Sequence, residues 1–230
     1  MTRSWETIAS EPTADGVLEL RRRGDQDFLI TIRGRVLMTS AAHRSEDALA
    51  RLACSGLPDR ARVLVSGLGM GFTLRAALAE LGPRAEVHVA ELNGVVADWC
   101  RGPLASLTGG AAIDPRVTLE IVDVAALIAR VARDASARRF DAIVLDMYEG
   151  PRSSVRADDP LYGPSAAARM RDSLVLGGAL SVWCEAASTG FERSLRAAGF
   201  RFELRRAGRG ARVHSLYLAR AVKPTSRRSR

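Results

Sequence analysis

Residues 62–72 read RVLVSGLGMGF, in which a short apolar run ends in three alternating glycines. The run, the glycine cluster and the helical pattern of residues 72–81 together predict a strand, a tight turn and a helix. Glycine lets a backbone turn tightly and approach a ligand closely. A turn without a ligand is the alternative, since the GxGxG spacing is one residue short of the GxGxxG fingerprint of dinucleotide sites. The position after a strand favours a ligand, because doubly wound sheets bind ligands at the carboxyl ends of their strands.

Strand and helix patterns alternate on the carboxyl side of this turn. Four further apolar runs have the length of buried strands, at residues 86–91, 117–122, 140–145 and 179–183. Residues 200–205 and 213–219 read as two more strands joined by GRGA, which is a hairpin signal. Such alternation predicts an α/β fold with a doubly wound, seven-stranded, mostly parallel sheet that closes with one antiparallel hairpin.

The amino-terminal part of the chain has a different pattern. Alternating apolar residues between positions 17 and 38 predict two or three short antiparallel strands, after a loose lead-in over residues 1–15. Residues 45–55 predict a helix with Ser45 as its N-cap. We therefore divide the chain into a small N-terminal strand domain with its linking helix (1–58), a ligand-binding domain (59–222) and a disordered basic tail (223–230).

Two acidic residues follow the second and third predicted strands of the large sheet. Glu91, about twenty residues after the glycines, is placed to accept hydrogen bonds from both hydroxyls of a ribose. Asp123 has two compatible interpretations, as the N-cap of the next helix or as the acceptor for an adenine amino group. The predicted nucleoside site comprises these two acids, the residues that follow them and the glycine loop: Gly67, Gly69, Met70, Gly71, Leu92 and Val124.

The loop after the fourth strand, LDMYEGP, is the predicted reaction site. Asp146 and Glu149 lie three residues apart in it, and two such carboxylates can bracket a cationic amine, one binding it and the other removing a proton. Tyr148 can stack on the ligand or donate a hydrogen bond to it. The alternative is an ordinary acidic turn that ends at Gly150 and Pro151. The placement just after a strand favours a functional loop.

Charge and composition argue against several classes of protein. The net charge of +8 suggests nucleic acid, but four basic residues lie in the tail and the other arginines are dispersed, so this partner is not expected. No apolar run reaches the ~18 residues of a membrane span, and residues 1–16 lack the pattern of a secretory signal. Cys54, Cys100 and Cys184 are isolated, which suggests reduced thiols, and no metal-site spacing is present. These features predict a cytoplasmic protein without a metal.

In their order and spacing, these segments resemble the spermidine synthase family within the class I methyltransferase fold. The similarity runs from about Val17 to Ala219 and includes SEDALARLA, VLVSGLGMGFTLRAAL, VHVAELN, VTLEIVDVAALI, FDAIVLDMYEGP and LYGPSAAARMRDSLVLGGALSVWCE. The resemblance implies that the glycine loop and Glu91 bind the nucleoside, that Asp123 lies beside adenine and that Asp146 deprotonates the attacking amine. Glu149 falls where the family has its second acidic residue.

Two departures from the family pattern concern the transferred group. The family's glycine loop carries an Asp that holds the donor's amine, whereas Met70 and its neighbours offer no carboxylate. The second acid is the longer Glu149, and the following proline is displaced to Pro151. Intact S-adenosylmethionine is therefore as compatible a donor as its decarboxylated form.

The function predicted on these grounds is transfer of a methyl, aminopropyl or aminocarboxypropyl group from such a donor to an amine. The expected partner is a small-molecule amine, and a homodimer is one expected assembly. The first alternative is an NAD-dependent oxidoreductase, which the GxGxG spacing and the closing hairpin oppose. The second is a non-catalytic nucleoside-binding protein, which the presence of both Asp146 and Glu149 opposes.

Overall fold

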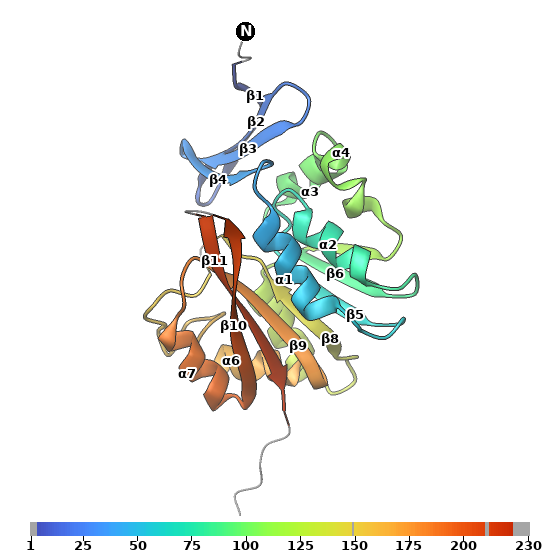
Figure 1. Ribbon diagram of the computed structural model, residues 1–230, viewed down its shortest axis with the longest axis vertical. Helices are drawn as coiled ribbons and strands as arrows, with labels where there is room; N and C mark the ends of the chain where they lie inside the picture. Colours follow the sequence, from blue (N-terminus) through green and yellow to red (C-terminus); the bar gives the residue numbers. More distant parts are fainter. Residues whose placement is uncertain (1–3, 149, 210–211, 223–230) are drawn as a thin grey trace, which may run out of the picture.

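The computed structural model describes residues 4–148, 150–209 and 212–222, and within these ranges the chain forms two β-sheets (Figure 1). The N-terminal sheet consists of β1 (Glu6–Thr13), β2 (Gly16–Arg23), β3 (Asp27–Ile32) and β4 (Arg35–Thr39). The large sheet consists of β5 (Arg62–Ser66), β6 (Glu86–Glu91), β7 (Val117–Ile121), β8 (Phe140–Leu145), β9 (Leu174–Cys184), β10 (Phe200–Arg209) and β11 (Arg212–Ala221). The predicted seven-stranded sheet with a small N-terminal β unit is confirmed.

The strand order of the large sheet is β10-β11-β9-β8-β5-β6-β7. Strands β5 to β9 pair in parallel, and β11 is antiparallel to both β9 and β10. The chain fills the sheet outward from β5, first through β6 and β7 and then on the other side through β8 and β9. The connections therefore diverge between β5 and β8, which is the kind of switch point where doubly wound sheets bind ligands.

Helices cover both faces of this sheet. They are α1 (Arg44–Cys54), α2 (Phe72–Glu80), α3 (Gly94–Arg101), α4 (Ala105–Thr108), η1 (Ala111–Ile113), α5 (Val124–Arg133), α6 (Pro164–Asp172) and α7 (Thr189–Ala197). Along β5, Val63 and Val65 pack into the core with α1, α2 and α3, whereas Leu64 packs into the core with α5, α6 and α7. This alternation with both faces buried is why β5 is a continuous apolar run in the sequence.

The N-terminal sheet lies over the carboxyl ends of the parallel strands (Figure 1). The prediction of a loose lead-in over residues 1–15 is wrong for residues 6–13, because β1 pairs with β2 there, with one register shift between Thr7 and Ala9. Its side chains are exposed or half-buried, so β1 shows no apolar alternation in the sequence. The strand exists because β2 satisfies its backbone hydrogen bonds, which composition does not reveal.

The starts of β9 and α1 also differ from the prediction. Helix α6 ends at Asp172, where the Ser173 hydroxyl donates to the carbonyl oxygens of Arg169 (2.8 Å) and Ile128 (3.0 Å). The strand β9 then starts at Leu174, five residues earlier than predicted. Ser45 is not an N-cap, because α1 already begins at Arg44.

Helix α1 packs against α2 and β9 of the large unit, and the predicted boundary at residue 58 stays a prediction. The predicted tail, residues 223–230, lies outside the described residues. No helix in the described part of the chain is long and apolar enough to cross a membrane.

Cys54, Cys100 and Cys184 are buried free thiols, and burial raises the pKa of each to about 12.

Candidate active site

The glycine loop after β5 brings backbone against the loop after β8. Gly67, Gly69 and Gly71 all have positive φ angles, of 79°, 51° and 83°. A Cβ atom on Gly67 would lie 2.2 Å from the carbonyl oxygen of Asp146, which is an impossible contact. Glycine at position 67 therefore permits both the left-handed turn and the close approach of the two loops.

Glu91, the last residue of β6, is held by the backbone of this loop. Its carboxylate accepts hydrogen bonds from the amide nitrogens of Leu68 (2.8 Å) and Asn93 (2.8 Å), and the side chain is only 7% exposed. A carboxylate has about four acceptor sites, so these two amides leave capacity for further donors. The side chain lines a cavity, which puts that capacity within reach of a ligand.

Leu92, Asp123 and Val124 follow the neighbouring strands β6 and β7 and also line the cavity. Asp123 caps α5 by accepting a hydrogen bond from the amide nitrogen of Ala126 (2.8 Å), so the capping interpretation is confirmed. Leu92 is 58% exposed, which is unusual for a leucine beside a buried strand end, whereas Val124 is buried. An apolar surface next to two acids suits the flat ring of a base with polar edges.

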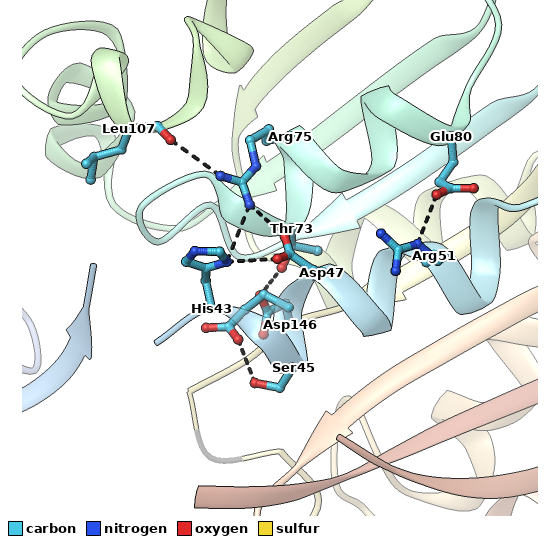
Figure 2. A network of polar contacts seen from close by, with 10 residues as sticks. His43, Ser45, Asp47, Arg51, Thr73, Arg75, Glu80, Leu107 and Asp146 are labelled. Carbon is cyan, nitrogen blue, oxygen red and sulfur yellow. Dashed lines mark hydrogen bonds and ion pairs between the residues drawn. The ribbon is translucent and has the colours of Figure 1, made fainter. Parts of the chain in front are cut away.

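Asp146 follows β8 and faces the first turn of α2. The Thr73 hydroxyl donates to its Oδ2 atom (Figure 2). Protein encloses the carboxyl group, and part of the residue opens onto the cavity. The pKa of Asp146 is raised to about 7, chiefly because burial disfavours the charged form and also because of the negative charge of Glu46, while the Thr73 hydrogen bond acts in the opposite direction. A carboxyl group of this kind can exchange protons at neutral pH.

Glu46 is a second carboxylate beside Asp146, and it comes from the first turn of α1. Its side chain is 8% exposed and lines the cavity. The neighbouring Ser45 hydroxyl donates to its Oε2 atom (2.5 Å).

A polar network fixes α1 against α2 (Figure 2). Asp47 accepts from Arg75 (2.7 Å) and contacts the Nδ1 atom of His43 (2.8 Å), and the His43 ring stacks on Phe72 at 4.5 Å. Arg75 also lies over the Phe72 ring. Because Glu46 precedes Asp47, this network also sets the position of Glu46 relative to the glycine loop.

Aromatic side chains from β9, β11 and the loop after β8 also line the cavity. The rings of Trp183 and His214 lie 4.7 Å apart, and both line the cavity. Tyr148 is 42% exposed, with the Arg35 guanidinium 5.4 Å above its ring. Aromatic faces attract cations as well as apolar groups.

The cavity that these residues enclose has a volume of about 790 Å³ and lies between the N-terminal sheet and the carboxyl ends of the parallel strands. This volume is in the range of sites for small molecules and cofactors. Its described lining contains five acidic residues, namely Glu46, Glu91, Asp123, Asp146 and Glu185. Within the described residues, no group of histidine, cysteine and acidic side chains has the arrangement of a metal site.

Most of the predicted site residues meet in this cavity. Those that line it are Gly67, Gly69, Glu91, Leu92, Asp123, Val124, Asp146 and Tyr148. Met70 and Gly71 are not part of the lining, and Met70 is fully buried in the core. Glu149 lies outside the described residues. The roles of all these residues in binding and catalysis stay predictions.

Sequence reasoning missed Glu46, Thr73 and His214 as site residues, whereas Trp183, interpreted from the sequence as core or pocket wall, does line the cavity. A signal for Glu46 was present, because it continues the buried stripe of α1 formed by Leu49, Ala50 and Ala53 at helical spacing. A glutamate on the apolar face of an amphipathic helix indicates a special environment. Thr73 gave no such signal, since threonine in a first helical turn is common.

The fold was compared with solved structures. A spermidine synthase from Thermotoga maritima superposes with a TM-score of 0.71 and 18% sequence identity, over 94% of this chain and 72% of that one. The chain has a spermidine synthase-like fold. A second spermidine synthase, in complex with the transition-state analogue AdoDATO, gives a TM-score of 0.70 with the same identity and coverage. The resemblance predicted from the motifs is confirmed at the level of the fold.

Sequence comparison gives a related result. Putrescine N-methyltransferase 3 of Nicotiana tabacum is 31% identical over 140 residues, which are 60% of this chain and 35% of that protein. Putrescine N-methyltransferase 2 of Nicotiana attenuata is 31% identical over a segment of the same length, 36% of that protein. The match thus spans about a third of these curated relatives. No family model matches the chain.

Proposed function

We propose that this chain transfers a methyl or an aminopropyl group from an S-adenosyl sulfonium donor to the nitrogen of a small amine. One observation carries the proposal: a single cavity at the switch point of the sheet joins a glycine loop, the buried carboxylate of Glu91 and the titratable carboxyl of Asp146. The relatives named as putrescine N-methyltransferases and the fold shared with spermidine synthases support it.

The nucleoside half of the donor fits the part of the cavity that is lined by residues after the carboxyl ends of β6 and β7. Glu91 has free acceptor capacity for ribose hydroxyls, and the exposed side chain of Leu92 offers a surface for the adenine ring. Asp123 accepts one backbone hydrogen bond at its Oδ1 atom, which leaves Oδ2 for the adenine amino group. Both predicted roles of Asp123 are then compatible, as the cap of α5 and as a base contact.

The chemistry requires little beyond alignment and one proton acceptor. The amine nitrogen attacks a carbon of the sulfonium group, the carbon–sulfur bond breaks, and the sulfur leaves with the electron pair as a neutral thioether. The nitrogen gains a positive charge and gives up one proton to the Asp146 carboxylate. A base with a pKa near the working pH is the most effective, and the surroundings of Asp146 bring it into that range. The walls of the cavity hold the two reactants in line.

Product analysis tests this proposal and identifies the transferred group. The protein is incubated with putrescine and either S-adenosylmethionine or its decarboxylated form, and the nucleoside products are measured by mass spectrometry. S-adenosylhomocysteine indicates methyl transfer, and methylthioadenosine with spermidine indicates aminopropyl transfer. If neither donor is consumed with any member of an amine panel, while a nicotinamide cofactor binds, the oxidoreductase alternative replaces the proposal. The predicted homodimer and cytoplasmic location stay predictions.

A further inference from the structure

Glu46 is a buried carboxylate without a cationic partner among the residues that the structure describes. Its carboxylate accepts a hydrogen bond from the hydroxyl of the adjacent Ser45. Its place in the first turn of α1 is favourable for an anion, since the amino end of a helix carries partial positive charge. That effect is small beside the cost of burying a charge, which proteins normally offset with a cation. The missing cation is therefore expected from a ligand.

The position of Glu46 shows where such a ligand would lie. Its side chain lines the same cavity as Asp146, close enough for its charge to act on that carboxyl group. The glycine loop, residues 67–71, contains no acidic residue. Its largest side chain, Met70, is fully buried in the core. Helix α1 thus supplies a carboxylate that the loop lacks.

The charge of the whole cavity agrees with a cationic occupant. The chain carries a net charge of +8, yet five acidic residues in the described part of the chain line this cavity. The two arginines in the lining, Arg35 and Arg44, are exposed side chains. Backbone amides donate to Glu91 and Asp123, and Glu185 is exposed to solvent, so Glu46 and Asp146 are the two remaining acids of the described lining.

We propose that Glu46 binds an alkylammonium group next to Asp146 and so anchors one of the two reactants. This inference rests on the proposed function for the identity of the reactants. The ammonium group has two sources: the donor, through the aminopropyl or amino-acid part of the S-adenosyl compound, and the acceptor amine. Both present the same chemistry to Glu46.

Isothermal titration calorimetry on wild-type protein and Glu46→Gln distinguishes the two sources. The variant keeps the size of the side chain and an acceptor for Ser45, but it lacks the charge. Methylthioadenosine has no ammonium group, so its affinity is expected to stay unchanged. If the donor supplies the ammonium group, the affinity for S-adenosylmethionine or its decarboxylated form falls about 10- to 150-fold. If the acceptor supplies it, donor affinity is unchanged and the KM for putrescine rises by a similar factor.

Two further variants separate this role from a structural one. Glu80→Gln is the matched control, because Glu80 also accepts from a serine hydroxyl, that of Ser55 (2.7 Å), but does not line the cavity. It is expected to leave all affinities unchanged. Glu46→Asp keeps the charge and is expected to recover part of the lost affinity, which a purely structural role of Glu46 would not predict.

Unchanged donor affinities together with an unchanged KM in Glu46→Gln would overturn the inference. If wild-type protein binds none of the nucleosides, the proposed function fails instead. The role of Glu46 is then decided by thermal shift with putrescine alone. A shift in the wild type that is absent from Glu46→Gln supports the ammonium site, and equal shifts or none in both proteins refute it.

Discussion

At the scale of single residues, the proton affinity of Asp146 is set by neighbours that act in opposite directions. Enclosure by protein and the charge of Glu46 raise its pKa, and the hydroxyl of Thr73 lowers it. The outcome is a carboxyl group with a pKa of about 7 at the end of β8. Balanced contributions of this kind are common where a side chain has to take up and release a proton.

Asp146→Asn tests whether this group is the base. The amide keeps the size of the side chain and can still accept from Thr73, but it cannot accept a proton under these conditions. Turnover is expected to fall by about 10²–10⁴-fold, the usual effect of losing a general base, with donor affinity nearly unchanged. Steady-state kinetics and calorimetry measure the two quantities. Normal turnover in this variant would mean that the reaction needs no base at Asp146.

Thr73→Val tests the hydrogen bond that lowers the pKa of Asp146. Valine has a similar shape but no donor, so the pKa of Asp146 is expected to rise. The reaction requires the deprotonated form, and the acidic limb of the pH–rate profile should therefore move to higher pH. Activity near pH 7 should drop several-fold and recover at about pH 9.

Glu46→Gln tests the other influence on Asp146, because it removes a like charge. The acidic limb of the pH–rate profile should then move to lower pH. If both variants moved this limb in the same direction, the described influences on Asp146 would be contradicted.

At the scale of elements, the turn between β5 and α2 depends on how closely it approaches the loop after β8. Gly67 and Gly56 both have positive φ angles, of 79° and 75°. A Cβ atom on Gly56 would meet nothing within 4 Å, whereas one on Gly67 would collide with the backbone of Asp146. The pair therefore separates conformational strain from the close approach of the two loops.

Gly67→Ala is expected to lower the free energy of unfolding by at least about 2 kcal/mol more than Gly56→Ala. Both variants bear the cost of a left-handed alanine, about 1 kcal/mol, and the first also has to move the loop of Asp146. Urea denaturation measures the difference, and donor affinity should fall in Gly67→Ala alone. Equal losses of stability in the two variants would show that the loops are free to separate.

The elements also show what the sequence reveals. The buried parallel strands and the glycine loop follow from apolar runs and from glycines that sterics require, so their predicted bounds were accurate to within five residues. Strand β1 was missed because its side chains are largely exposed and only backbone pairing holds it in place. Glu91 and Asp146 were found because strand ends are marked in the sequence. The approach of Glu46 to Asp146 joins residues a hundred positions apart, which no local pattern encodes.

At the scale of the whole molecule, a basic protein carries an acidic cavity. The net charge of +8 is distributed over the surface and the terminal segment, while the carboxylates of the lining are concentrated where the two sheets meet. A cavity of opposite sign concentrates cationic ligands against the average field of the protein. The same arrangement lowers the free energy of unfolding at neutral pH, because burial makes the charged form of an enclosed carboxyl group less favourable than its protonated form.

Asp146→Asn should therefore change how stability depends on pH. In the wild type the pKa of Asp146 is about 7 in the folded state and near 4 in the unfolded state, so the folded state binds more protons between these values. Stability is then lost as the pH rises from about 4 to about 7. The variant lacks this loss and should be more stable above pH 7, by about 2–4 kcal/mol, but similar at pH 4. Chemical denaturation at pH 4.5 and pH 8 measures it; a constant difference would place the titration elsewhere.

A crystal structure of the protein with methylthioadenosine, whose adenosine and sulfur both donors share, tests most directly whether the cavity is a nucleoside site. We expect the nucleoside in the cavity, with both ribose hydroxyls within hydrogen-bond distance of Glu91, the adenine ring against Leu92 and the thioether sulfur directed toward Asp146. A cavity that stays without nucleoside at saturating concentration, or a nucleoside bound with its ribose away from Glu91, would contradict it.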